Sequence, residues 1–283
     1  MMKVLVTGVG GQLGYEVVKE LERRHIDCMG ADLKEFDITD YEAAHRFITD
    51  YGPDAVVHCS AYTAVDKAES NRDVCRQVNA VGPENIARIC KKIDAKMVFI
   101  STDYIFDGKG TQFREPDDAA KPLNFYGQTK WEGEQAVRHY LNKYFIVRIS
   151  WAFGKNGNNF IKTMLKLSQT RTEVNVVDDQ IGSPTYMLDL APLLCDMIMT
   201  NAYGTYHATN EGICSFAEFA EEIFRQAGVT CRVNHIPSSD YPTAAKRPFN
   251  SRMSKEKLVE NGFKKLPTWQ DAVRRYLVEV ASC

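Results

Sequence analysis

The residues best suited to proton transfer in this sequence are Tyr126 and Lys130, which lie four positions apart. At that spacing on a helix, two side chains share one face and lie about one turn apart. Because an ammonium group favours a neighbouring phenolate, we expect Lys130 to lower the pKa of Tyr126 from its ordinary value of about 10. The pair therefore predicts proton transfer near neutral pH, and the alternative is two surface residues on an exposed helix.

Two hydroxyl groups, those of Ser101 and Thr102, end an apolar run that predicts a strand over residues 96–101. The carboxyl ends of strands are where open α/β sheets bind their ligands. We therefore predict that the Thr102 hydroxyl hydrogen-bonds the substrate oxygen that Tyr126 protonates. The alternative is that the two hydroxyls only cap a turn.

A glycine-rich turn with the sequence TGVGGQLG, at residues 7–14, lies between a predicted strand and a predicted helix. In this context the pattern indicates a dinucleotide site. Gly8 permits the tight turn, Gly11 lets the backbone approach a pyrophosphate, and Gly14 permits close packing of helix on strand. The helix N-terminus adds free N–H groups and a positive dipole end. An ordinary glycine-rich turn is the alternative.

Asp32 ends the second predicted strand, where a carboxylate can accept hydrogen bonds from a ribose diol. The same carboxylate would repel a ribose 2′-phosphate, so we expect NADH to be preferred over NADPH. Lys34 is close enough to weaken this preference, and a solvated acid at a strand end is the alternative. Lys130 is expected to hydrogen-bond the nicotinamide ribose as well, which gives it a second role.

These residues need a framework that brings strand ends and helix starts together. Near-continuous apolar runs predict strands buried on both faces, and they alternate with amphipathic runs that predict helices. The predicted strands cover residues 3–6, 26–31, 55–59, 96–101, 144–150, 173–177 and 204–208. The predicted helices cover residues 11–24, 66–81, 83–92, 126–141, 159–168, 188–199, 216–227 and a last stretch from about 267. The alternation predicts an α/β fold with a doubly wound, mostly parallel sheet of the Rossmann type.

Composition and charge exclude several classes of protein. The chain has 283 residues, of which 44% are hydrophobic and 25% are charged, as expected for a globular protein with a large core. A net charge of −2 provides no basic field for nucleic acid or an anionic membrane, and no apolar run is long enough to cross a bilayer. The eight cysteines, from Cys28 to Cys283, include no C-x-x-C pair, which favours reduced thiols in a cytoplasmic protein.

Seven motifs, in chain order, resemble those of one protein family. They are TGVGGQLG at 7–14, AYTAVDKAE at 61–69, STDYIFDG at 101–108, YGQTK at 126–130, RISW at 148–151, DQIGSPT at 179–185 and RPFNSR at 247–252. The first, third and fourth are typical of the extended short-chain dehydrogenase/reductase superfamily. The whole set resembles the dTDP-4-dehydrorhamnose reductases and spans nearly the entire chain.

The resemblance implies NAD(P)H-dependent reduction of the 4-keto group of dTDP-4-dehydro-L-rhamnose to dTDP-L-rhamnose, with Tyr126 as the proton donor. It also implies a role for individual positions. These are Gly11, Gln12 and Leu13 at the cofactor pyrophosphate, Asp37 and Ile38 beside the adenine, Ala61, Tyr62 and Thr63 along the cofactor, Thr102, Asp103, Tyr104 and Trp151 at the sugar nucleotide, and Arg247 at its diphosphate. Tyr104 and Trp151 could instead pack in the core, and Arg247 could be a solvated charge.

We further expect two lobes, with the ligand site in the cleft between them. Residues 1–150, with about 173–199 returning to extend the sheet, should hold the dinucleotide, and a smaller C-terminal lobe of about 151–172 and 200–283 should hold the sugar nucleotide. Some members of the family form dimers bridged by magnesium. Glu16 matches one ligand position, but Leu188 replaces the later acid, and Asp189 lies one residue further along, about 100 degrees around a helix. We therefore expect no metal, and a homodimer without a metal bridge stays open.

Two other functions fit parts of the same pattern. Near-identical motifs occur in the regulatory subunit of methionine adenosyltransferase, a cofactor-binding partner, although the complete set of Thr102, Tyr126 and Lys130 favours an enzyme. Another nucleotide-sugar epimerase, reductase or dehydratase is the second alternative. Dehydratases have an Asp-Glu pair after the threonine, whereas this chain has Asp103 and Tyr104.

Overall fold

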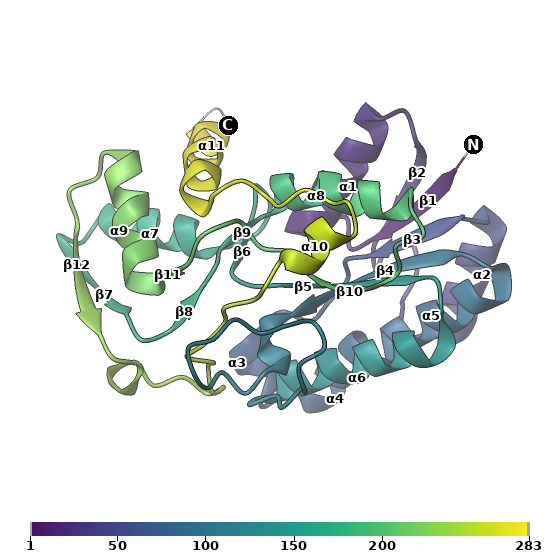
Figure 1. The fold of residues 1–283 in the computed structure, drawn as a ribbon, viewed down its shortest axis with the longest axis horizontal. Helices are drawn as coiled ribbons and strands as arrows, with labels where there is room; N and C mark the ends of the chain where they lie inside the picture. Colours follow the sequence, from purple (N-terminus) through teal and green to yellow (C-terminus); the bar gives the residue numbers. More distant parts are fainter. Residues whose placement is uncertain (1, 282–283) are drawn as a thin grey trace.

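The computed structural model describes residues 2–281 and has a six-stranded sheet at its centre (Figure 1). The strand order is β10-β5-β4-β3-β1-β2, and every neighbouring pair is parallel. The strands are β1 (Lys3–Thr7), β2 (Asp27–Ala31), β3 (Ala55–His58), β4 (Lys96–Thr102), β5 (Tyr144–Ile149) and β10 (Gly204–His207). The chain runs from β1 to β2 on one side and returns to β3 on the other, so its winding reverses there. Such a reversal places a ligand crevice at the carboxyl ends of β1 and β3.

Helices cover both faces of this sheet because successive strand residues point in opposite directions. Val4 and Val6 lie in one core cluster with residues of α1 and α8, and Leu5 lies in another with residues of α2, α5 and α6. In Figure 1, α1 and α8 lie above the sheet, and α2, α5 and α6 lie below it. The helices are α1 (Gln12–Arg23), α2 (Tyr41–Tyr51), α5 (Gly82–Ile93), α6 (Phe125–Tyr140) and α8 (Met187–Ile198). The predicted doubly wound α/β fold is confirmed.

A second hydrophobic core lies at the left of Figure 1, away from the large sheet. Its helices are α7 (Phe160–Ser168), α9 (Phe216–Ala227) and α11 (Trp269–Ala281). Helix α9 begins at a capping box in which Ser215 and Glu218 bond each other's backbone N–H groups. The short strands of this part of the chain are β6 (Ala152–Phe153), β7 (Glu173–Val177), β8 (Ile181–Gly182), β9 (Thr185–Tyr186), β11 (Cys214–Ser215) and β12 (Arg232–Ile236).

One predicted strand lies in a different sheet from the one expected. Strand β7 pairs with β12, and it is β10 that extends the large sheet beside β5. In β7, Val174 and Val176 are buried whereas Glu173 and Asn175 are exposed. A strand with one polar face suits a small sheet at the surface, because an inner parallel sheet is covered on both faces. Of residues 173–199, therefore, only α8 returns to the large sheet.

The single helix predicted over residues 66–81 is in fact three short pieces. They are α3 (Val65–Ala68), α4 (Arg72–Arg76) and a π-helical turn, η1 (Gln77–Val81). Pro83 has no N–H to continue the α-helical ladder, and Gly82 N–H instead bonds the carbonyl of Gln77, five residues back. Helix α2 was not predicted from the sequence, although Asp40 caps its start and Gly52 ends it in the left-handed conformation.

Residues outside these elements form loops, two 3₁₀ turns, η2 (Asp103–Ile105) and η3 (Ser238–Asp240), and the short helix α10 (Glu256–Glu260). Within residues 2–281, no helix is both long enough and apolar enough to cross a membrane. The seven cysteines of the described residues are all free thiols, and Cys283 lies outside them.

Candidate active site

The glycine turn between β1 and α1 is packed so closely that side chains would not fit. Gly8 has a φ of 74°, and a Cβ added there would lie 2.7 Å from the backbone nitrogen of Ser60. A Cβ on Gly14 would lie 2.3 Å from the carbonyl oxygen of Gly8. Gly11 precedes the first turn of α1 and caps it with no side chain, so the first N–H groups of this helix are available to an anion.

Asp32 lies at the end of β2 and faces the glycine turn. Its Oδ2 accepts a hydrogen bond of 2.9 Å from the N–H of Gly10, and its Oδ1 accepts one of 3.0 Å from the N–H of Leu33. A carboxylate offers about four lone-pair positions, so lone pairs remain for a ribose diol. The acid therefore supports the turn and faces the cleft at once.

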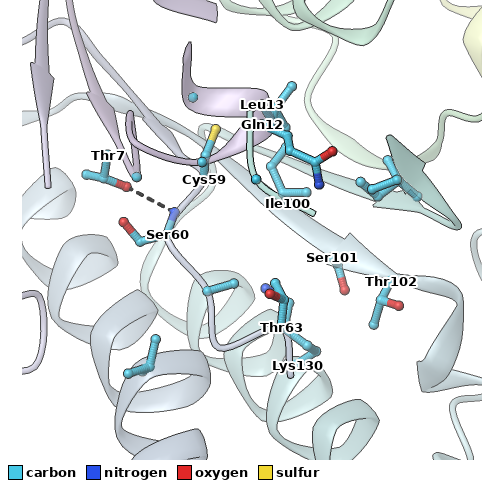
Figure 2. Close-up of a pocket in the computed structure, with 18 of the residues that line it drawn as sticks. Thr7, Gln12, Leu13, Cys59, Ser60, Thr63, Ile100, Ser101, Thr102 and Lys130 are labelled. Carbon is cyan, nitrogen blue, oxygen red and sulfur yellow. Dashed lines mark hydrogen bonds between the residues drawn. The ribbon is translucent and has the colours of Figure 1, made fainter. Parts of the chain in front are cut away.

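A single cleft runs along the carboxyl ends of the strands and contains most of the predicted site residues. Figure 2 shows Gln12 and Leu13 on one side, with Ser101 and Thr102 of β4 and Lys130 of α6 further along. The predicted residues that line it are Gly8, Gly11, Gln12, Leu13, Gly14, Asp32, Asp37, Ile38, Ala61, Thr63, Thr102, Asp103, Tyr104, Tyr126, Lys130 and Trp151. Tyr62 and Arg247 do not line it. The side chain of Tyr62 packs beside Phe125 instead.

Helix α6 carries Tyr126 and Lys130 in its first two turns. Asn124 caps this helix by accepting a hydrogen bond of 2.8 Å from the N–H of Gly127. A Cβ on Gly127 would lie 2.2 Å from the carbonyl oxygen of Tyr104, so only glycine lets α6 approach the turn after β4 this closely. This approach brings the ring of Tyr126 edge-on to that of Tyr104, with 5.6 Å between the ring centroids.

Burial has the largest effect on the pKa values of Tyr126 and Lys130. It raises the pKa of Tyr126 above its ordinary value, the Asp103 carboxylate adds to this, and a hydrogen bond with Thr102 opposes it. Burial also lowers the pKa of Lys130 to about 8, and the Glu134 carboxylate opposes that shift. The predicted lowering of the Tyr126 pKa by Lys130 is therefore wrong, because loss of solvation has the largest effect on this pKa and the Asp103 carboxylate acts in the same direction.

A raised pKa leaves Tyr126 as a neutral phenol at neutral pH. A phenol in this state can donate its proton to an oxyanion, which is a stronger base than phenolate. The Nζ atom of Lys130 lies 4.2 Å from the centroid of the Phe99 ring, in a side chain that is almost fully buried. Tyr126 is thus a proton donor, and Lys130, one helical turn away, is a partly desolvated cation.

Asp103 joins the active site to the C-terminal part of the chain. Its carboxylate accepts hydrogen bonds from Thr102, at 3.0 Å, and from Ser251. Burial raises the pKa of Asp103 to about 6, although these hydrogen bonds favour its charged form. In this arrangement the single proton of the Thr102 hydroxyl points to Asp103, so the hydroxyl must turn before it can donate to a substrate.

Arg247 reaches the site indirectly, through Tyr104. It donates a hydrogen bond of 2.9 Å to the Tyr104 hydroxyl and forms an ion pair of 2.5 Å with Asp66. The arginine is thus engaged in a network and is not a solvated surface charge. Asp66 belongs to the AYTAVDKAE motif, but it was not among the predicted site residues.

Trp151 lies at the far side of the cleft in the left-handed backbone conformation, with a φ of 49°. Its ring stacks on Phe216, with 3.8 Å between the ring centroids. Both rings line the cleft, so they offer an aromatic surface to a ligand and also pack against the second core.

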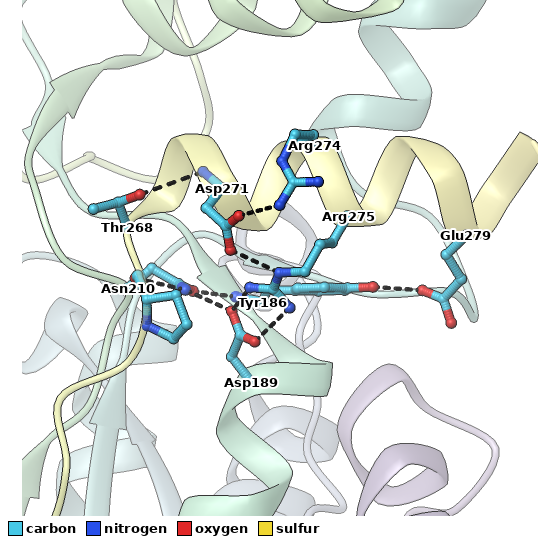
Figure 3. A network of polar contacts seen from close by, with 9 residues as sticks. Tyr186, Asp189, Asn210, Thr268, Asp271, Arg274, Arg275 and Glu279 are labelled. Carbon is cyan, nitrogen blue, oxygen red and sulfur yellow. Dashed lines mark hydrogen bonds and ion pairs between the residues drawn. The ribbon is translucent and has the colours of Figure 1, made fainter.

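Of the two acids considered for a metal bridge, Glu16 is buried with Lys19 as its ion-pair partner at 3.6 Å, and Asp189 is bound by an arginine. Figure 3 shows Asp189 of α8 beneath α11, where it accepts two hydrogen bonds of 2.7 Å from Arg275 and one of 2.7 Å from Asn210. Among residues 2–281, no group of three or more His, Cys, Asp or Glu side chains is arranged to hold a metal ion.

Comparison with known proteins matches this geometry to a family. The family model described as RmlD substrate binding domain matches residues 2–282. The chain is 37% identical over 299 residues to the dTDP-4-dehydrorhamnose reductase of Escherichia coli (strain K12), with 99% of this chain and 98% of that protein covered. The chain belongs to the dTDP-4-dehydrorhamnose reductase family.

Other members of the reductase family are similarly related. The spore coat polysaccharide biosynthesis protein SpsK of Bacillus subtilis (strain 168) is 39% identical over 282 residues, with 100% of this chain and 99% of that protein covered. The crystal structure of the Bacillus anthracis dTDP-4-dehydrorhamnose reductase in complex with NADP has a TM-score of 0.96 and 41% identity, with 99% and 100% of the two chains covered. The fold and the family predicted from the sequence are both confirmed.

Several residues of this reductase's cleft were not predicted from the sequence. They include Phe36, Ser60, Asn158 and Phe216, all of which line the cleft. Ser60 directly precedes the predicted segment 61–63, and that position was the available signal. Asn158 and Phe216 come from segments far along the chain, and neither carries a motif that points to the cleft.

Proposed function

We propose that this protein reduces the 4-keto group of dTDP-4-dehydro-L-rhamnose to give dTDP-L-rhamnose. The observation that carries the proposal is one cleft in which Thr102, Tyr126 and Lys130 lie together with the glycine turn at residues 7–14. The substrate is proposed from the relatives, such as the Escherichia coli protein that bears the name dTDP-4-dehydrorhamnose reductase.

The chemistry divides between cofactor and protein. When bound, the reduced nicotinamide supplies the hydride. Tyr126 donates its phenolic proton to the carbonyl oxygen as negative charge develops there, and the Thr102 hydroxyl turns from Asp103 to donate a hydrogen bond to the same oxygen. Because burial raises the pKa of Tyr126, the proton stays on the phenol until the oxyanion forms. Lys130, charged below its pKa of about 8, stabilises the phenolate that remains and hydrogen-bonds the nicotinamide ribose.

The cofactor in this proposal is NADH or NADPH, with NADH preferred. The turn at residues 7–14 and the start of α1 suit a pyrophosphate, and Asp37 and Ile38 line the cleft where the adenine would lie. Asp32 favours NADH through its hydrogen bonds to a ribose diol. The Bacillus anthracis relative holds NADP, so members of the family accept the 2′-phosphate as well.

The sugar nucleotide would lie beyond the nicotinamide, against Asp103, Tyr104 and Trp151. Arg247 would meet its diphosphate, for which a guanidinium is well shaped, by moving from its ion pair with Asp66. In this division residues 1–150, with α8 and β10, hold the cofactor, and the residues of the second core cover the substrate. We place the protein in the cytoplasm, consistent with its free thiols.

The test is turnover of dTDP-4-dehydro-L-rhamnose generated in situ, followed as loss of reduced nicotinamide absorbance with NADH and NADPH in separate reactions. Robust turnover that is lost in Tyr126→Phe would support both the reaction and the proton donor. Tight cofactor binding without turnover would instead favour the regulatory-subunit alternative or a different sugar. A cofactor that survives extensive dialysis would favour an epimerase, since a reductase must release its product cofactor.

A further inference from the structure

One buried carboxylate near the active site, that of Glu134, takes no part in the proposed mechanism. The side chain of Glu134 is 0% exposed and that of its partner Arg148 is 1% exposed. Arg148 donates two hydrogen bonds of 2.8 Å to the two carboxylate oxygens, and Ser101 donates a third of 2.6 Å. A buried charge is costly unless it is paired in this way, so the arrangement demands an explanation.

The contacts of Glu134 extend to the neighbouring strands. Arg138, one turn further along α6, donates a hydrogen bond of 2.9 Å to Glu134 and one of 3.0 Å to Thr205 of β10. Arg148 of β5 also donates a hydrogen bond of 2.8 Å to the carbonyl oxygen of Pro116. A single acid therefore ties α6 to β4, β5 and, through Arg138, to β10.

We propose that Glu134 is a positioning residue of the active site, which locks α6 against the carboxyl end of β4 and places a negative charge one helical turn from Lys130. Glu134 lies four residues after Lys130, on the same face of α6. Its hydrogen bond to Ser101 joins α6 to the residue directly before Thr102. The acid thus links the segment that carries Tyr126 and Lys130 to the segment that carries Thr102. The inference rests on the proposed function.

The charges around Glu134 and Lys130 determine whether the loss of Glu134 raises or lowers the pKa of Lys130. Glu134 is faced by Arg148 and Arg138, with His207 behind Arg148 at 3.3 Å. Lys130 is faced by Glu134 and by the thiols of Cys59 and Cys75. Burial lowers the pKa of Lys130, and the Glu134 carboxylate acts in the opposite direction. Removing this negative charge should therefore lower the pKa of Lys130 further, so that the lysine loses its proton at a lower pH.

The experiment measures the pKa of Lys130 directly and turnover in parallel. The protein is labelled with ¹³C-lysine, the Cε signal of Lys130 is assigned with Lys130→Met, and its shift is followed against pH. In Glu134→Gln we expect the midpoint to fall by about one pH unit, as when an opposite charge is removed within about 4–6 Å. We expect kcat at pH 8 to fall about tenfold or more, because the catalytic groups lose their alignment. Glu134→Asp, which keeps the charge, should restore the midpoint.

Asp189→Asn is the matched control. Asp189 also accepts two hydrogen bonds from one arginine, Arg275, but it joins α8 to α11 and does not contact α6. It should therefore change neither the Lys130 midpoint nor kcat. An equal change in Asp189→Asn would overturn the inference, since loss of any arginine-paired acid would then suffice.

A second set of variants guards against misfolding. Glu134→Gln leaves Arg148 buried without a counter-charge, which strongly destabilises folded proteins. The double variant Glu134→Gln with Arg148→Met removes both charges, and Ser101→Ala removes only the bond to β4. In the double variant, we expect the midpoint of the Lys130 titration to be lower than in the wild type. In Ser101→Ala, we expect a reduced kcat and an unchanged midpoint of that titration. A wild-type midpoint in the folded double variant would overturn it, and so would wild-type kcat in Ser101→Ala.

The two proposals fail in different ways. If the wild-type protein does not reduce the sugar nucleotide, the proposed function is wrong. The Lys130 titration needs no substrate, so it still decides whether the Glu134 carboxylate raises the pKa of this lysine.

Discussion

The carboxylates of Glu134 and Asp189 are each held by two hydrogen bonds from one arginine, yet their surroundings differ. The Glu134 and Arg148 side chains are 0% and 1% exposed, whereas those of Asp189 and Arg275 are 8% and 30% exposed. The first pair lies between α6 and strands of the large sheet, directly behind the active site. The second pair fastens α11 to α8 (Figure 3).

The difference shows how burial changes the contribution of an ion pair between a carboxylate and an arginine. Breaking a fully buried pair costs about 3–5 kcal/mol because one charge stays desolvated, whereas exposed pairs contribute about 0–1 kcal/mol. Arg275 can regain water when its partner is lost, and Arg148 cannot. A buried pair therefore holds its elements in one geometry, as catalytic groups require, and a partly exposed pair serves mainly to fasten a helix.

The largest expected effect on activity comes from changing the proton donor of the active site. Tyr126→Phe should lower kcat by about 10²–10⁴-fold, the usual contribution of general acid catalysis, with cofactor affinity near that of the wild type. Steady-state turnover and a fluorescence titration with reduced nicotinamide measure the two quantities. A Phe variant that keeps most of its activity would remove Tyr126 from the mechanism.

Lys130→Met should lower both turnover and cofactor affinity, each about tenfold or more, as expected when a hydrogen bond from a charged group is lost. The wild-type protein should also lose kcat/KM as the pH rises through about 8, where Lys130 gives up its charge. This alkaline limb should be absent from the Met variant. If the same limb persists there, some other group is responsible for it.

Asp32 is a third carboxylate, partly exposed and without an arginine partner among residues 2–281. Asp32→Ala should raise the ratio of kcat/KM for NADPH to that for NADH about tenfold, because a like charge no longer faces the 2′-phosphate. Initial rates with the two cofactors measure this ratio. An unchanged ratio would place Asp32 outside the ribose site and leave it as a support for Gly10.

The smallest effect on activity should come from Asp189→Asn. We expect the free energy of unfolding, measured by urea denaturation, to fall by about 1–2 kcal/mol, since a charged hydrogen-bond acceptor is lost. Turnover should stay near the wild-type value. A large loss of kcat would contradict the distinction between the buried pair and the partly exposed pair.

Local backbone chemistry made much of the site predictable from the sequence. The turn at residues 7–14 requires glycine at Gly8 and Gly14 because their neighbours leave no room for a Cβ. The spacing of Tyr126 and Lys130, and the capping of α9 by Ser215, follow from helix geometry over a few residues. Alternating apolar runs likewise predicted the parallel sheet, because each strand must be buried on both faces.

Only the tertiary structure decided which elements meet and how deeply groups are buried. It paired β7 with β12 and brought Ser101, Glu134 and Arg148 together from separate segments. It also reversed the expected direction of the Tyr126 pKa shift, because burial raises this pKa and the Asp103 carboxylate adds to the rise. The physical reason is one of range: dihedral preferences and periodicity act over a few residues, whereas strand partners, desolvation and buried ion pairs depend on contacts between residues far apart in the chain.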